Sequence, residues 1–145
     1  MALRLIARAE QNVSGLSRKL EKKGYDLTCI QAVVTKLCET GLLDDRRYAC
    51  LWLESRIGRQ ASSPLRLLSS LRYRNINRHD ADFALKETLD DEAELHLLHR
   101  FVQKLTHRRV RKGEGVGNDP AQSLKYILRS EGFSQQAIQS YFDKP

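Results

Sequence analysis

Histidines and cysteines are the residues of this sequence that could bind a metal ion. His96 and His99, within HLLH, share a helix face, but no third ligand occurs at a recognisable spacing, and zinc needs at least three protein ligands. The cysteines are odd in number and lie nine and twelve residues apart, without a CxxC pair: Cys29, Cys38 and Cys50. We therefore expect no metal and no disulfide, and we predict that the cysteines are buried free thiols in a cytoplasmic protein.

Two acidic pairs, Asp44-Asp45 and Asp90-Asp91, offer carboxylates for acid–base catalysis. Both pairs stand where helices are expected to begin, so capping of the positive helix end explains them without catalysis. The segment GEGVGN (113–118) is glycine-rich like a phosphate-binding loop, but no Walker sequence follows it, and we interpret it as a connecting loop. Because a nucleophile elbow and an HExxH motif are also absent, we predict that the protein is not an enzyme and has no cofactor.

Basic side chains carry the clearest functional signal. The net charge of +7 favours a polyanionic partner, such as nucleic acid or an acidic protein surface. The run HRFVQKLTHRRVRK (99–112) contains no acidic residue, and its helix already has an apolar stripe for packing, so we expect its basic side chains to be free to face a partner. Phosphate contacts of this kind position a chain without reading sequence. The predicted contact residues are Arg100, Lys104, Arg108, Arg109, Arg111 and Lys112, followed by Arg56, Arg59, Arg66, Arg72 and Arg74.

The elements that must position these residues repeat along the chain. Two leucines four apart, a glycine, an aromatic residue and an isoleucine occur with identical spacing at 16–30 and 124–138, and a weaker copy lies at 67–81. The leucines share a helix face, and the residue after the last turn takes a positive φ that closes the helix. Each copy therefore predicts a helix, a tight turn and a second helix. The turn residues are Gly24, Asn75 and Gly132.

Helix-start signals divide the chain further. Asp26 and Ser134 can cap the helices that follow two of the turns, while Ser63-Pro64 and Asp119-Pro120 put a capping residue before proline at the first helical position. One more helix precedes each pair, the first of them short, from Ala2 to about Ala9. We therefore predict an all-α, elongated array of about nine helices in three tandem three-helix units, at 1–43, 44–90 and 91–145. Tyr48 and Trp52 should anchor the middle unit, and Phe101 the last.

Membrane insertion and export are not expected. No run approaches the roughly 18 apolar residues that a membrane span needs. The first residues, MALRLIARAEQ, lack the apolar core and cleavage site of a signal peptide, so we expect them to belong to the fold. With 145 residues, 41% of them hydrophobic and 30% charged, the chain has the composition of an ordinary folded domain.

The segment GLLDDRRYACLWLESR (41–56) resembles the signature of the RecX family of RecA regulators, which reads Gly-Leu-Leu-Asp-Asp, two residues, then Phe/Tyr-Ala. Segments 16–37 and 124–138 are similar to that family's first and third repeats, in the same order. The sequence departs from the family pattern at 60–63, where QASS replaces a glycine-rich approach to Pro64, at Asn75, where the family has glycine, and loosely over 78–94.

The resemblance implies a non-enzymatic, all-helical modulator that lies in the helical groove of a RecA filament on single-stranded DNA. It would suppress filament growth, and with it ATP hydrolysis, strand exchange and co-protease activity, and we expect it to be a monomer. Two alternatives stay open: a helix-turn-helix-like transcription regulator and a helical scaffold that binds only protein. Against the first, no helix is rich in the Asn, Gln and Arg that read base edges.

Overall fold

The computed structural model describes residues 1–113 and 119–144. These residues form nine α-helices and no β-strand, so the predicted all-α fold is confirmed. In chain order the helices are α1 (Ala2–Arg8), α2 (Val13–Lys22), α3 (Leu27–Glu39), α4 (Asp45–Ile57), α5 (Pro64–Tyr73), α6 (Arg78–Thr88), α7 (Asp91–Lys112), α8 (Pro120–Ser130) and α9 (Gln135–Asp143). Of the predicted loop at 113–118, only Gly113 lies within the described residues.

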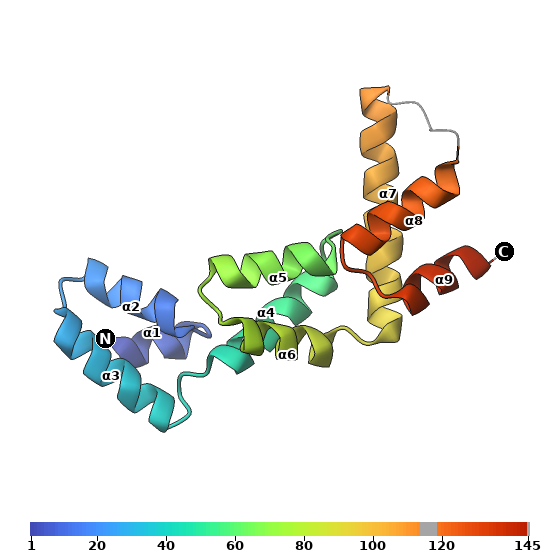
Figure 1. The fold of residues 1–145 in the computed structure, drawn as a ribbon. Helices are drawn as coiled ribbons and strands as arrows, with labels where there is room; N and C mark the ends of the chain where they lie inside the picture. Colours follow the sequence, from blue (N-terminus) through green and yellow to red (C-terminus); the bar gives the residue numbers. More distant parts are fainter. Residues whose placement is uncertain (114–118, 145) are drawn as a thin grey trace.

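The helices follow one another along an extended molecule. Helices α1–α3 form one end, α4–α6 the middle, and α7–α9 the other end, with α7 standing upright beside α8 and α9 (Figure 1). Helix α4 packs most extensively on α6, and α7 packs on α9. The unit boundaries at residues 43 and 90 stay a prediction.

The tight turns have the predicted backbone. Gly24 and Gly132 have φ of 87° and 88°, and Asn75 has φ of 61°. At each turn the next residue's amide donates back to the second leucine of the motif: Tyr25 to Leu20 (3.3 Å), Ile76 to Leu71 (3.1 Å) and Phe133 to Leu128 (3.1 Å). This is the long hydrogen bond of a Schellman cap, which satisfies a carbonyl that the helix end would otherwise leave unpaired.

The predicted capping residues also take that role. In each case a side-chain oxygen accepts from backbone amides in the first helical turn: Asp26 for α3, Asp44 for α4, Ser63 for α5, Asp119 for α8 and Ser134 for α9. These contacts span only two or three residues, so sequence alone is enough to set them.

The buried apolar residues form two separate clusters. The cluster of helices α4–α9 is continuous, and it includes Phe101, which is 6% exposed with its ring centroid 5.5 Å from that of Phe133. Phe101 is thus buried as predicted. A smaller cluster holds the first helices together and consists of Leu16, Leu20, Ile30, Leu37 and Leu43. The two clusters do not merge, and hydrogen bonds such as those of Asn12 with Arg74 and of Val13 with Asp45 connect the first three helices to the middle of the chain.

The predicted anchors of the middle unit lie at the edge of the core. Helix α4 buries Ala49, Leu53 and Ile57, which are four residues apart on one face. Trp52 and Tyr48 are half-buried and pack against this face from the side. Both side chains thus pack on the core of the middle unit, as predicted, but from its margin, because Ala49, Leu53 and Ile57 form the fully buried stripe of the helix.

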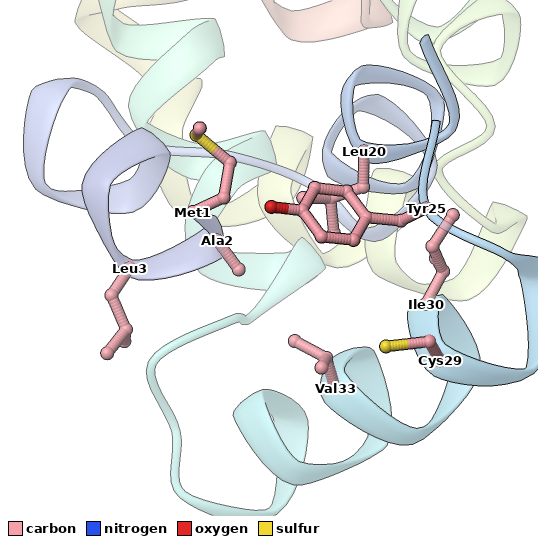
Figure 2. A pocket seen from close by; sticks show the side chains of 8 residues that line it. All are labelled: Met1, Ala2, Leu3, Leu20, Tyr25, Cys29, Ile30 and Val33. Carbon is pink, nitrogen blue, oxygen red and sulfur yellow. The ribbon is translucent and has the colours of Figure 1, made fainter. Parts of the chain in front are cut away.

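The prediction of buried thiols is wrong for Cys29 and Cys38 and only partly met by Cys50. Cys29 and Cys38 are exposed and Cys50 is half-buried; all three are free thiols. Helix α3 turns Ile30 and Leu37 into the core, which places the cysteines one residue away from that face, at its margin. The sulfur of Cys29 reaches a pocket of about 250 Å³ that is mainly apolar (Figure 2).

Candidate functional site

The basic run of α7 is used partly inside the molecule. The guanidinium of Arg100 donates to the carbonyl oxygens of Ile57 and Gly58, the latter at 2.9 Å, and the Lys104 ammonium lies 3.4 Å from the carbonyl of Ala61. The carbonyls at the end of α4 have no partner within their own helix, so Arg100 satisfies them from α7. The expectation that the side chain is free to face a partner is therefore wrong for Arg100, whereas Lys104 is exposed and stays a predicted contact residue.

The last turns of α7 carry the remaining cations of the run. Arg108 and Arg111 are exposed and line a hollow of about 610 Å³, together with Lys104, His107 and Lys112. Arg109, which is half-buried, and Arg111 also lie in the last helical turn, where positive charge is favoured by the helix dipole. This end of α7 can therefore attract a polyanion, although part of its charge has a local structural role.

A second basic site lies between α4 and α5. The guanidinium carbons of Arg56 and Arg74 each lie 5.2 Å from the ring centroid of Trp52, and Arg74 also donates to the hydroxyl of Tyr48 at 3.3 Å. Both contacts fit a cation on the face of an aromatic ring. Next to them, Tyr73 is 90% exposed. Trp52, Tyr73 and the two arginines line a groove with a volume of about 390 Å³.

Sequence reasoning identified the two arginines of this groove but not its aromatic residues. Trp52 and Arg56 are four residues apart, a spacing that stacks two side chains on one helix face. Tyr73 and Arg74 are adjacent. An arginine four residues after a tryptophan was thus the local sequence signal for the contact between Arg56 and Trp52. The packing of α5 beside α4 adds Tyr73 and Arg74 to the groove.

The other predicted contact residues are scattered. Arg66 forms an ion pair with Glu131 at 3.5 Å and so lies at the contact between α5 and the end of α8. Arg59 and Arg72 are exposed. The structure therefore brings the predicted cations together at two places, the α4–α5 groove and the end of α7.

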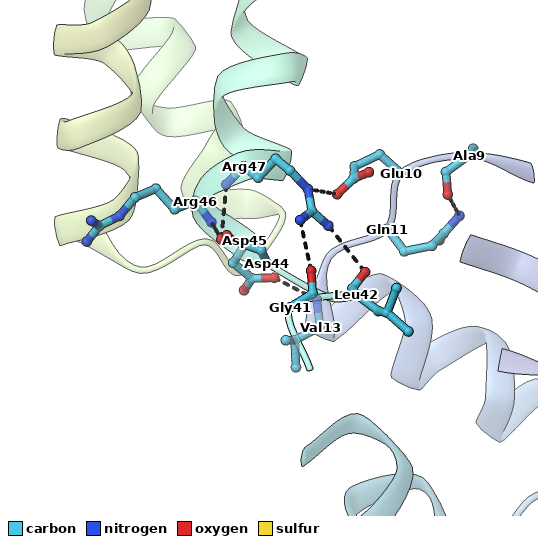
Figure 3. A network of polar contacts seen from close by, with 10 residues as sticks. All are labelled: Ala9, Glu10, Gln11, Val13, Gly41, Leu42, Asp44, Asp45, Arg46 and Arg47. Carbon is cyan, nitrogen blue, oxygen red and sulfur yellow. Dashed lines mark hydrogen bonds and ion pairs between the residues drawn. The ribbon is translucent and has the colours of Figure 1, made fainter. Parts of the chain in front are cut away.

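A polar joint fixes the groove relative to the first three helices. The side-chain amide of Asn12 donates to the backbone carbonyl of Arg74 at 2.7 Å. The backbone amide of Val13 donates to the carboxylate of Asp45, also at 2.7 Å. Arg47 forms an ion pair with Glu10 at 2.8 Å and donates to the carbonyls of Gly41 and Leu42, in the connection that follows α3 (Figure 3). Burial raises the pKa of Asp45 above its ordinary value, with smaller contributions from neighbouring carboxylates, while the Val13 hydrogen bond opposes the rise.

Metal binding and membrane insertion find no support in the described part of the chain. Within residues 1–113 and 119–144, no three His, Cys, Asp or Glu side chains gather into a group that could hold a metal ion. Each described helix is too short or too polar to cross a membrane. The cations and aromatic rings of the two basic sites offer ionic contact, hydrogen bonding and stacking.

Comparison with known proteins finds several relatives that share one name. No family model matches the chain. It is 34% identical over 141 residues to the Regulatory protein RecX of Halorhodospira halophila, and 31% identical over 139 residues to that of Pelodictyon phaeoclathratiforme. Each alignment covers 96% of this chain and 82% of the relative. The Regulatory protein RecX of Treponema pallidum is 33% identical over 108 residues, or 74% of this chain and 66% of that protein.

Two solved structures share the fold. A crystal structure of regulatory protein RecX matches with a TM-score of 0.76 at 23% identity, covering 98% of this chain and 68% of that one. The crystal structure of RecX from Lactobacillus salivarius matches with a TM-score of 0.72 at 19% identity, covering 97% and 89%.

Proposed function

The chain belongs to the RecX family of regulatory proteins, and on that premise we propose that it regulates the RecA recombinase without being an enzyme itself. It binds the RecA filament on single-stranded DNA as a cytoplasmic monomer. Binding inhibits filament growth, and thereby ATP hydrolysis, strand exchange and co-protease activity.

The observation that carries this proposal is family membership over almost the whole chain, at 34% identity across 96% of its residues. The extended arrangement of the helices supports it, because a row of helical units offers a long surface to a long partner. Positive charge at the α4–α5 groove and at the end of α7 suits a partner that carries phosphates.

The order of addition tests the proposed mechanism. ATP hydrolysis by the RecA of the same organism is measured on single-stranded DNA, with this protein added either before RecA or after the filament has formed. We expect the steady-state rate to fall with increasing protein, and to fall further when the protein is present during assembly. Rates that stay unchanged in both orders would contradict the proposal. Tight binding to one duplex sequence with no effect on RecA would support a transcription regulator instead.

A further inference from the structure

The groove between α4 and α5 combines cations and aromatic rings. The guanidinium groups of Arg56 and Arg74 each lie over the Trp52 ring, and Tyr73 lines the groove with 90% of its surface exposed. Serine hydroxyls line the same space, and its described lining includes no carboxylate. The volume of about 390 Å³ is enough for part of a ligand rather than for a solvent molecule alone.

The two guanidinium groups keep capacity for an anion. In the described residues, neither Arg56 nor Arg74 forms an ion pair with an acidic side chain, whereas Arg46, Arg47 and Arg66 each do. Contact with an aromatic face uses the flat side of a guanidinium and leaves its N–H groups directed outward, where they can bind phosphate oxygens. The groove is thus a place where positive charge is held without neutralisation.

The aromatic side chains distinguish between classes of anionic partner. The carboxylates of an acidic peptide would bind the arginines, but they offer no flat group that could stack on the exposed ring of Tyr73. Proteins that bind single-stranded nucleic acid combine a basic groove with exposed aromatic rings on which bases stack. In addition, the indole N–H of Trp52, a residue that lines the groove, is buried without an acceptor among the described residues and so keeps an unused donor.

We propose that this groove binds single-stranded nucleic acid, with backbone phosphates on Arg56 and Arg74 and a base stacked on Tyr73. The inference deepens the proposed function, on which it rests for its biological setting, by naming the surface that meets the DNA strand of the filament. The binding itself requires no RecA.

Trp52 is the only tryptophan of the chain, so its fluorescence reports on this groove directly. The whole protein is titrated with an oligothymidylate at several salt concentrations, and binding is followed in parallel by the anisotropy of a labelled strand. We expect the Trp52 emission to change along with the anisotropy. If both arginines contact phosphate, they should contribute about 1.4 to the log–log slope of affinity against salt, at about 0.7 for each phosphate. Absence of binding, or binding that leaves the emission unchanged, would overturn the proposal.

Matched variants separate the groove from general charge. Arg56→Gln with Arg74→Gln should lower the salt slope by about 1.4, whereas the control Arg4→Gln with Arg18→Gln removes the same charge from exposed positions and should leave the groove's contribution in place. Tyr73→Ala should weaken binding about five- to a hundredfold, as expected for the loss of one stacked base. Its side chain is almost fully exposed, so folding is not at issue.

Two outcomes would count against a nucleic-acid ligand. If the control pair weakens binding as much as the groove pair, the attraction is non-specific. If polyglutamate changes the Trp52 emission as strongly as oligothymidylate, and Tyr73→Ala has no effect, the groove takes an acidic peptide. Because the titration contains no RecA, either result would leave the proposed regulation of RecA to its own test.

Discussion

The side-chain amide of Asn12 donates a 2.7 Å hydrogen bond to the backbone carbonyl of Arg74, although 62 residues separate them. Arg74 follows the last residue of α5, where carbonyls lack partners within the helix. Asn12 is itself the cap of α2, accepting from the amide of Gly15 at 3.2 Å. One side chain thus starts one helix and closes another. The guanidinium of the same Arg74 lies over Trp52, so this bond also braces the α4–α5 groove.

Asn12→Ala should destabilise the protein by about 1–3 kcal/mol, because it removes both a helix cap and a buried donor. Urea unfolding measures the cost. Asp26→Ala is the matched control, since Asp26 caps α3 from an exposed position and its capping bond stays within its own turn. We expect the control to cost less than Asn12→Ala. Equal costs would show that the bond to Arg74 contributes nothing to stability.

Gly132→Ala should destabilise the protein by about 1–2 kcal/mol through its φ of 88°, which side chains rarely adopt. A Cβ at this position would also lie 3.4 Å from the amide nitrogen of Leu65, which donates to the carbonyl of Glu131. Gly24→Ala separates the two effects, because Gly24 has nearly the same φ and no atom within 4 Å of the added Cβ. Thermal unfolding should therefore show a larger loss for Gly132→Ala. A smaller loss than in Gly24→Ala would mean that the contact with Leu65 is not tight.

Arg100→Met should destabilise the protein by about 1.5–3 kcal/mol, since it leaves the carbonyls of Ile57 and Gly58 without their charged donor. Methionine keeps an unbranched apolar side chain at the position, so the lost hydrogen bonds dominate the change. Arg108→Met, on an exposed position of the same helix, should change stability by less than about 0.5 kcal/mol. Chemical denaturation of both variants tests whether Arg100 stabilises the fold through these hydrogen bonds. Similar stabilities of the two variants would show that it does not, and that its charge is free for a partner.

Arg108→Glu combined with Arg109→Glu should weaken binding to single-stranded DNA or to the filament, if the end of α7 contacts phosphate. Each lost phosphate contact should lower the log–log salt slope by about 0.7. The helical circular dichroism spectrum must first match that of the unaltered protein. Undiminished inhibition of RecA by this folded variant would place the working surface elsewhere, with the α4–α5 groove as the next candidate.

Asp45→Asn should change how stability depends on pH. Burial raises the pKa of Asp45 in the folded state, so the folded protein holds this proton more tightly than the unfolded chain does. The resulting stabilisation is present below the ordinary value of 3.8 and is lost as the pH rises through the raised pKa. Asparagine cannot ionise but keeps an oxygen to accept from Val13. The stability of the variant relative to the unaltered protein should therefore be greater at pH 7 than at pH 3, and a difference that is independent of pH would contradict the assignment.

The turns and caps could be predicted because their interactions are local. Gly24, Asn75 and Gly132 are recognisable from their place after two leucines, and the hydrogen bonds that close each turn span only a few residues. The same holds for the capping side chains, each of which bonds an amide two or three residues away. Helix number and the all-helical class follow from these signals together with the apolar spacing.

Tertiary structure decided which side chains remain available to a partner. Periodicity placed Arg100 on the polar face of its helix, but only the approach of α4 turns it inward, across 43 residues, to the carbonyl of Ile57. Likewise, the pattern of α4 did not show that a second arginine would lie over Trp52, because Arg74 comes from the end of another helix. A helical period indicates which residues share a face, while the packing of distant helices determines which part of that face is covered.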